Sequence, residues 1–286
     1  MIDLNLYSLP PLVTKYFGPH LADLAELTAA DSPYKTPYFL NYISDPALLE
    51  KRLQRLEPLG LIEPILAEVK GQKDAYQLDE RLRDAWAELR VADQLRKEGF
   101  ERIKKVEVTA DFTAIKNNRE YAVQVTRIRT ELSNQRDKLN EEARRNKGKL
   151  RTGERYGELD KILFEQEKPF ENFVWDAIQR KNDKFQNLTE NTRCIALVAN
   201  DKDLNDDNFM LHTECRMIAK IIQCLQDKDN LNFEELFWFP DTSNGALFTT
   251  KPLQCFCDWQ NEPLPYERNF EEVNRQEIDL NNPYQI

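Results

Sequence analysis

The stretch VEVTADFTAIKNNREYAVQVTRI, residues 106–128, decides the fold of this chain. Apolar and polar residues alternate on both sides of Asn117 and Asn118, as they do in antiparallel strands with two unlike faces. Asparagine tolerates the positive φ that a tight two-residue turn requires. We therefore expect strands over 102–109, 111–116 and 120–128, with the last two joined in a hairpin.

A hairpin in this register brings three polar side chains together. Asp111 lies directly opposite Gln124, and side chains opposed in this way have Cβ atoms about 5 Å apart. Thr126 shares their face because strand residues two apart point the same way. The spacing predicts that Asp111, Gln124 and Thr126 converge on one spot.

A predicted helix over 79–98 adds a carboxylate. Its apolar residues repeat at the helical period: Leu82, Ala85, Trp86, Leu89, Ala92 and Leu95. Glu88 falls inside this stripe, where a carboxylate is costly unless it is paired or binds a metal. A salt bridge at the edge of the stripe is the alternative interpretation.

The remaining pattern indicates a mixed α/β (α+β) fold, a central sheet flanked by helices. After the hairpin we expect a charged segment over 130–168 and then helices and strands in alternation: helix 169–187, strand 193–200, helix 207–226, and strands near 235–240 and 246–250. Residues 1–78 form a separate N-terminal region, and residues 261–286 an acidic tail.

The segment from Glu88 to Ile128, with AELRVADQLRKEGF followed by the hairpin, resembles the catalytic core of the PD-(D/E)XK nuclease superfamily. The resemblance implies a restriction-endonuclease-like domain over 79–260, with 130–168 as a basic insertion. It makes Glu88 the helix acid and Asp111 the motif aspartate. Gln124 takes the second-carboxylate position, as in Mrr-type restriction endonucleases. Together these oxygens are implied to hold Mg²⁺ or Mn²⁺ for phosphodiester hydrolysis.

The departure from that family is Thr126, because the pattern has lysine there and threonine carries no positive charge. Arg127 points to the other face of a regular strand. Lys181 is our candidate for the missing cation, since it lies in the apolar stripe of the predicted helix 169–187, with Lys184 in reserve. A lysine in such a stripe either reaches a functional pocket or extends its head to the surface.

Basic residues follow the predicted active-site strand. From Thr126 to Arg155 there are ten Lys and Arg against five Asp and Glu, within a chain of net charge −10. We expect contacts to nucleic-acid phosphates from Arg127, Arg129, Arg136, Arg144, Arg145, Lys147 and Lys149. Internal pairing of these charges is the alternative.

Residues 36–79 resemble a winged helix-turn-helix. A leucine-rich helix from Pro46 to Leu59 precedes two expected short strands between Pro64 and Leu78, around Gly71. In that family the helix enters the DNA major groove and the hairpin forms the wing. An ordinary packing unit of helix and hairpin explains the pattern equally well.

Composition narrows the remaining possibilities. No apolar run reaches the roughly 18 residues that a membrane span needs. The 5 cysteines match no disulfide framework, which favours reduced thiols in the cytoplasm. A zinc set of His212, Cys215, Cys255 and Cys257 lacks the usual paired spacing.

Three functions remain open. The first is a Mg²⁺-dependent endonuclease acting on DNA rather than RNA, in restriction or defence against mobile elements. The second is a catalytically degenerate nuclease fold that binds DNA or assembles a complex. The third is a winged-helix transcription regulator. A homodimer or a larger complex is compatible with each.

Overall fold

The computed structural model describes the chain in several stretches and divides it into two compact units, Met1–Val125 and Thr126–Ile286. The stretches that it describes are residues 9–29, 39–43, 46–106, 110–128, 170–185, 192–198, 225, 231–239, 246–250 and 253–257. Within these stretches, no helix is both long and apolar enough to cross a membrane.

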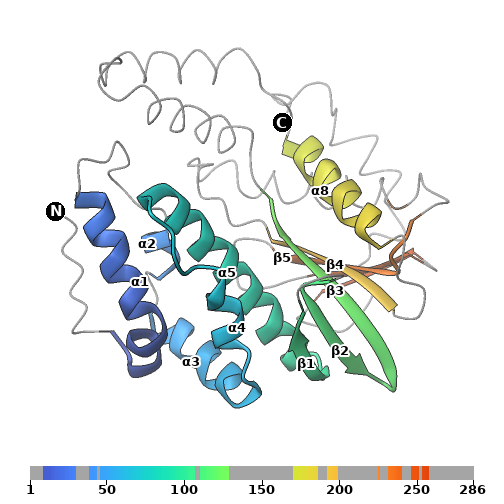
Figure 1. The fold of residues 1–286 in the computed structure, drawn as a ribbon. Helices are drawn as coiled ribbons and strands as arrows, with labels where there is room; N and C mark the ends of the chain where they lie inside the picture. Colours follow the sequence, from blue (N-terminus) through green and yellow to red (C-terminus); the bar gives the residue numbers. More distant parts are fainter. Residues whose placement is uncertain are drawn as a thin grey trace, which may run out of the picture. The chain divides into compact units, whose positions relative to one another are not determined.

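A long central helix organises the first unit (Figure 1). This is α5, Ala75–Lys97, which begins where the Asp74 side chain accepts a hydrogen bond from the Gln77 N–H. The shorter helices pack on α5 through apolar side chains such as Phe17, Leu53 and Leu66. They are α1 (Pro11–Ala29), α2 (Phe39–Tyr42), α3 (Pro46–Leu56) and α4 (Ile62–Ala67). The 3₁₀ turn η2 (Glu57–Leu59) follows α3.

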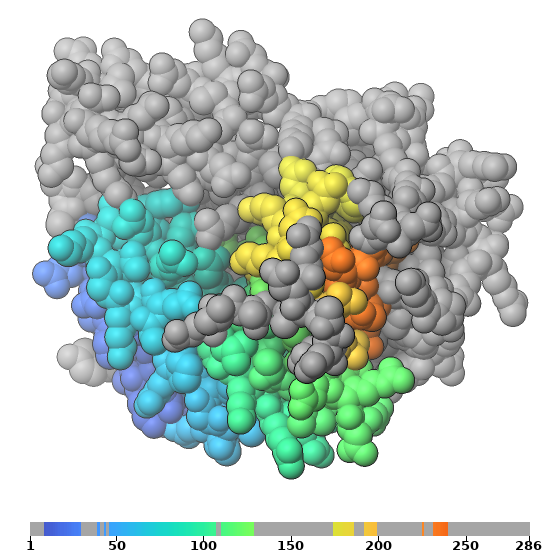
Figure 2. Space-filling view, turned by 45° about the vertical axis from the view of Figure 1, so that its right-hand side comes forward, coloured from blue at the N-terminus to red at the C-terminus, as the bar shows by residue number. Residues whose placement is uncertain are grey.

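A three-stranded antiparallel sheet follows α5, and Figure 2 shows it in green beside the helices of the same unit. Its strands are β1 (Glu101–Lys105), β2 (Phe112–Lys116) and β3 (Arg119–Arg127). Asn117 and Asn118 have φ of 52° and 60°, as the predicted turn requires. The pairing runs from Lys116 with Arg119 to Phe112 with Val123, which confirms the predicted register.

One irregularity in this sheet matters for the site. The pairing of β1 with β2 shifts by one residue between Glu101 and Lys104, and Arg102 has φ of 50°. Such a bulge changes which face of the sheet the following side chains occupy. Regular alternation from Glu101 would put Lys105 on the face of Ile115, but the bulge puts it opposite Phe112 instead.

The second unit combines a helix with a mixed sheet. Its elements are α8 (Phe170–Lys184), β4 (Thr192–Val198), β5 (Glu235–Phe239), β6 (Ala246–Thr250) and β7 (Leu253–Cys257). β4 and β5 are parallel, and β5, β6 and β7 pair antiparallel in sequence order. The predicted mixed α+β architecture, a sheet with flanking helices, is therefore confirmed.

Two predictions about the N-terminal region need correction. The two strands expected between Pro64 and Leu78 are wrong, because α4 and the beginning of α5 occupy this stretch. Ile62, Ile65, Leu66 and Val69 are all buried, and their spacing of three and four residues is that of a helix. Without these strands, residues 36–79 lack the wing of a winged helix.

The predicted boundary between residues 78 and 79 falls inside α5, whereas the two units meet between Val125 and Thr126. The basic insertion 130–168, nearly all of the predicted helix 207–226 and the acidic tail lie outside the described residues.

Candidate active site

Glu88 supplies the first carboxylate of the site. It lies on α5 between the fully buried Leu89 and Ala87, and its side chain is only 14% exposed. This is the placement that the helical wheel predicted. Because water reaches the carboxylate poorly, its charge depends on a nearby cation.

Asp111 supplies the second carboxylate and is anchored by backbone bonds. Its own N–H donates to the Val123 carbonyl, and its carbonyl accepts from the Val106 N–H. One carboxylate oxygen, Oδ2, accepts from the Val125 N–H at 2.6 Å. The side chain thus bonds to a strand N–H of β3, and this contact fixes the direction of the other oxygen, Oδ1.

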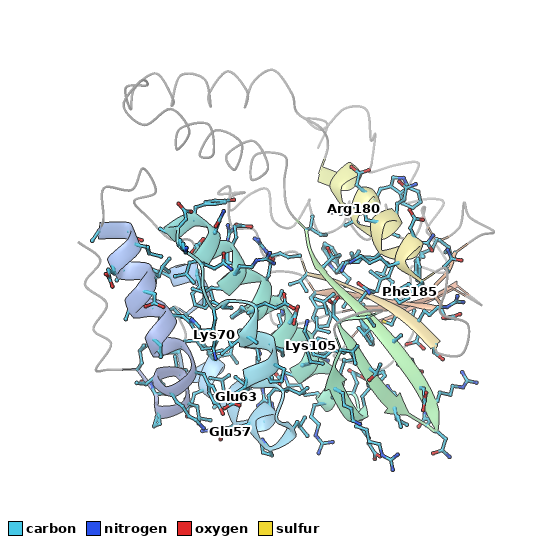
Figure 3. All side chains as sticks on the ribbon, viewed as in Figure 1. Glu57, Glu63, Lys70, Lys105, Arg180 and Phe185 are labelled. Atoms are coloured by element: carbon cyan, nitrogen blue, oxygen red, sulfur yellow. The ribbon has the colours of Figure 1, made fainter. Side chains whose placement is uncertain are left out.

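A lysine that the sequence analysis did not select joins the two carboxylates. The ammonium of Lys105, the last residue of β1, lies 2.7 Å from Glu88 Oε2 and 3.9 Å from Asp111 Oδ1. Glu68, just after α4, places Oε1 3.6 Å from the same nitrogen. Figure 3 labels Lys105 between α5 and the hairpin. We call Lys105, Glu88, Asp111 and Glu68 the Lys105 cluster.

The bulge at Arg102 explains why Lys105 points into this cluster. It places the lysine on the face of Phe112, whose ring centre is 5.6 Å from the ammonium. The side chain is only 6% exposed, so its stem is covered and its charge is directed to the carboxylates. A strand bulge beside a functional site often re-aims a side chain in this way.

Burial and neighbouring charges set the protonation of the cluster. Desolvation raises the pKa of Glu88 to about 7; the positive charge of Lys105 opposes this, and the negative charges of Asp111 and Glu68 add to it. For Lys105, burial lowers the pKa, but the attraction of Glu88, Asp111 and Glu68 outweighs burial and raises it. The ammonium therefore remains charged while Glu88 titrates near neutral pH.

The other predicted residues of the hairpin occupy β3. Gln124 is buried, and it follows Val123, the residue that pairs with Phe112. Its predicted place opposite Asp111 lies one step beyond that pair and stays a prediction. Thr126 is half-buried and its hydroxyl donates to the Arg127 carbonyl at 3.5 Å. Arg127 is buried, and its predicted contact with nucleic acid stays a prediction.

The remaining predicted residues lie in the second unit or outside the described residues. Lys181 is half-buried and Lys184 exposed, both on α8 in the second unit, so their roles stay predictions. Within the described residues of the first unit, Lys105 places its ammonium beside Glu88 and Asp111. The predicted phosphate-binding residues Arg129, Arg136, Arg144, Arg145, Lys147 and Lys149 lie outside the described residues.

For a metal, the described part of the chain has no group of three His, Cys, Asp or Glu side chains arranged to hold one. The predicted set contains two carboxylates, Glu88 and Asp111, with the Gln124 amide as a third oxygen. In the alternative zinc set, His212 and Cys215 lie outside the described residues.

The comparisons with known proteins add no further assignment. A scan against protein-family models and searches of curated proteins and of solved structures found no match for this chain. The candidate site therefore rests on its own residues. Chemically, the Lys105 cluster offers a charged ammonium beside two carboxylates, one of which titrates near neutral pH.

Proposed function

We propose that this chain is a Mg²⁺-dependent endonuclease that hydrolyses phosphodiester bonds of DNA. The observation that carries the proposal is the Lys105 ammonium, which lies within 4 Å of oxygens from both Glu88 and Asp111. Carboxylates for a metal and a cation for the phosphate are the two groups that such a hydrolysis needs.

The two carboxylates suit a divalent ion in three respects. Both face the Lys105 ammonium, which brings their oxygens toward one point. Burial disfavours the anionic form of Glu88, which a cation relieves. One Asp111 oxygen is committed to the Val125 N–H, which holds the other in place. The residues that would hold the ion are Asp111 and Glu88, with Gln124 as an amide ligand.

When bound, Mg²⁺ would lower the pKa of a coordinated water and stabilise negative charge on the phosphate. Lys105 has a separate task. Its ammonium stays charged beside the carboxylates and can donate to a phosphate oxygen as negative charge develops there. It would thus replace the charge that Thr126 lacks, but from β1 instead of β3.

The cellular setting belongs to the same proposal. We expect DNA to be the partner and the cytoplasm to be the compartment, with restriction or mobile-element defence as the biological role. Contact with DNA by the basic residues after Arg127 is part of this expectation. A homodimer or a larger complex would allow two strands to be cut together.

The proposal is tested by incubating the full chain with supercoiled plasmid, with Mg²⁺, with Mn²⁺ and with a chelator. We expect nicking or linearisation that requires the metal, and its loss in Asp111→Asn. Asparagine keeps an oxygen that can accept the Val125 N–H bond, whereas alanine would leave that buried donor unpaired. Glu120→Gln, an exposed carboxylate on β3, is the matched control. Cutting that persists in Asp111→Asn removes this site from the reaction.

A second function is favoured by one specific observation. Lys105 already neutralises Glu88 at 2.7 Å, so the cluster is partly satisfied without a metal. This arrangement supports a degenerate nuclease fold that binds DNA or assembles a complex without cutting. Plasmid binding without cleavage under every metal condition would select this alternative.

A further inference from the structure

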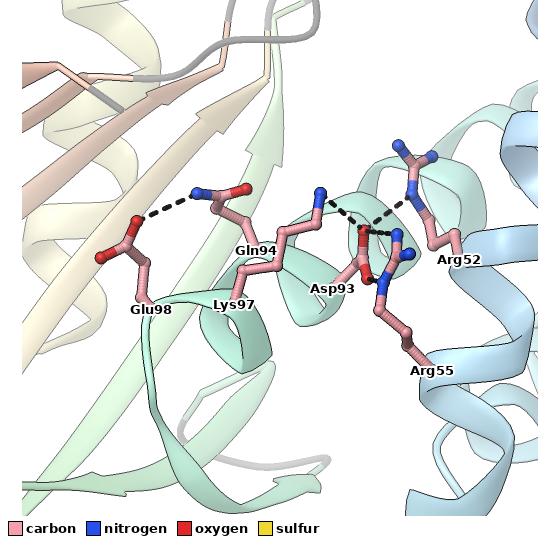
Figure 4. Close-up of polar contacts among 6 residues, drawn as sticks. All are labelled: Arg52, Arg55, Asp93, Gln94, Lys97 and Glu98. Atoms are coloured by element: carbon pink, nitrogen blue, oxygen red, sulfur yellow. Dashed lines mark hydrogen bonds and ion pairs between the residues drawn. The ribbon is translucent and has the colours of Figure 1, made fainter. Parts of the chain in front are cut away.

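A second group of charges lies where α3 packs on α5, and it has the opposite composition (Figure 4). Among the residues that the structure describes, its only carboxylate is Asp93, whose side chain is 2% exposed. Three cations surround it: Arg52 and Arg55 from α3, and Lys97 from the last turn of α5. We call these four residues the Asp93 cluster.

The three cations are not equally well paired. Arg55 makes two bonds to the carboxylate, Nε to Oδ1 at 2.5 Å and Nη2 to Oδ2 at 2.8 Å. Lys97 Nζ lies 3.3 Å from Oδ2, and Arg52 Nε lies 3.6 Å from the same oxygen. Asp93 can neutralise only one of the three charges, so the cluster keeps an excess of positive charge.

Arg52 is the most weakly paired of the three cations. The residue is buried, and its Nε is closed off from solvent with no hydrogen-bond acceptor among the described residues. Its guanidinium lies 5.1 Å from the centre of the Trp86 ring, a contact that offsets part of the charge. In Figure 4 its two terminal nitrogens point away from Asp93. A buried guanidinium held this weakly is costly unless an anion joins it.

The other two cations remain within reach of solvent. The Arg55 side chain is 37% exposed and that of Lys97 is 50% exposed. An anion that approaches this surface would meet two accessible cations with a third behind them. Guanidinium groups match the oxygens of a phosphate in a forked geometry, and an ammonium adds a point charge.

We propose that Arg52, Arg55 and Lys97 bind a phosphate group, and that in the working protein it is a phosphate of the nucleic-acid backbone. This source of the phosphate rests on the proposed function, whereas the site itself rests on the excess of cations around Asp93. The contact fixes the position of the strand and reads no bases, because the Arg52 and Arg55 side chains are held against α5.

The position of the site on α5 gives it a role in substrate alignment. Asp93 follows Glu88 by five residues, which on an α-helix is about 7.5 Å along the axis and roughly 140° around it. The two clusters therefore occupy different sides of one rigid element. A strand held at Arg55 and Lys97 would be fixed relative to the Lys105 cluster by α5 itself.

The test measures binding in a chelator, so that no cleavage intervenes. The probes are inorganic phosphate and a short fluorescent DNA oligonucleotide, each titrated into the full chain and three variants. Arg55→Gln and Lys97→Gln each remove one cation and leave two to pair Asp93, so folding should persist. Lys51→Gln, an exposed lysine on the same helix α3, is the matched control.

We expect at least about tenfold weaker binding of phosphate and of oligonucleotide in Arg55→Gln and Lys97→Gln, and little change in Lys51→Gln. Phosphate binding alone with this pattern supports the site and identifies free phosphate as its source. Binding that falls equally in all three variants, or not in any, overturns the inference. If the inference is overturned but the chain still cuts plasmid with metal, the nuclease proposal stands. If binding depends on Arg55 and Lys97 but the chain never cuts, the nuclease proposal is refuted and the phosphate site stands.

Discussion

The two charge clusters on α5 have opposite compositions. Around Lys105, three carboxylates share one ammonium; around Asp93, three cations share one carboxylate. Both central groups are nearly closed to water. Counted over the described residues, the Lys105 cluster has more negative than positive groups, and the Asp93 cluster has more positive than negative groups. One cluster is suited to attract a further cation and the other a further anion, and a metal-dependent enzyme acting on a phosphodiester needs both.

In these two clusters, burial matters more than the number of charges. Exposed ion pairs such as Lys15 with Glu57 contribute little, because water screens each partner. Glu88 and Arg52 are shielded, and their pKa values move in the directions that favour the neutral form: burial raises that of Glu88 and lowers that of Arg52. Shielded groups of this kind favour the binding of a ligand of opposite charge.

The largest effect should come from the centre of the first cluster. Lys105→Met keeps the stem over Phe112 and removes the charge, so we expect plasmid cleavage to fall about 10³-fold. Lys104→Met, the exposed neighbour on β1, should cut almost normally. Lys181→Met tests the rival lysine on α8. Should Lys181→Met abolish cleavage while Lys105→Met spares it, the cation comes from α8 and the Lys105 cluster is only structural.

The centre of the second cluster should matter for folding more than for chemistry. Asp93→Asn leaves Arg52, Arg55 and Lys97 around a neutral amide, and we expect a loss of about 3 kcal/mol in the free energy of unfolding. Urea denaturation measures it, with Glu120→Gln as the control. A loss below about 1 kcal/mol would mean that groups other than Asp93, or water, already stabilise the three positive charges.

A smaller, pH-dependent effect should distinguish the clusters. The pKa of Glu88 is about 7 in the folded protein, above its ordinary value in an unfolded chain. The folded state thus holds a proton that the unfolded state has released, and stability from this group is lost as pH rises through 7. Glutamine at this position does not titrate. The free energy of unfolding of Glu88→Gln, relative to that of the natural chain, should therefore rise by about 2 kcal/mol between pH 5 and pH 8.

Urea denaturation at both pH values measures that difference, and Glu120→Gln should show none. A gap that stays constant across this range would mean that Glu88 is ionised throughout. The Lys105 ion pair would then outweigh burial.

The sequence was most informative where local rules govern. Asn117 and Asn118 predicted the turn and, through it, the register that pairs Phe112 with Val123. The period of the apolar residues predicted α5 and the burial of Glu88. The error over 64–78 arose from reading Gly71 as the centre of a hairpin. Gly71 does have φ of 80°, but it lies in the turn between α4 and α5.

Lys105 could not be selected by the same rules. Its orientation depends on a one-residue bulge at Arg102. A bulge reverses the alternation of side chains between the two faces of the sheet, so the pattern of apolar and polar residues does not predict it. The Asp93 cluster was missed because its partners, Arg52 and Arg55, come from α3, about forty positions earlier in the chain. The sequence did hold a sign of this cluster. Asp93 directly follows the buried Ala92 on α5, just as Glu88 follows the buried Ala87.

The most direct test of the account is a Mn²⁺ titration of the full chain, read by electron paramagnetic resonance. We predict binding that is lost in Asp111→Asn and retained in Glu120→Gln. In Lys105→Met we predict binding at least about tenfold tighter, since the ammonium competes with the ion for Glu88 and Asp111. That variant should bind the metal and still fail to cut. Equal Mn²⁺ binding by the natural chain, Asp111→Asn and Lys105→Met would contradict a metal site at this cluster.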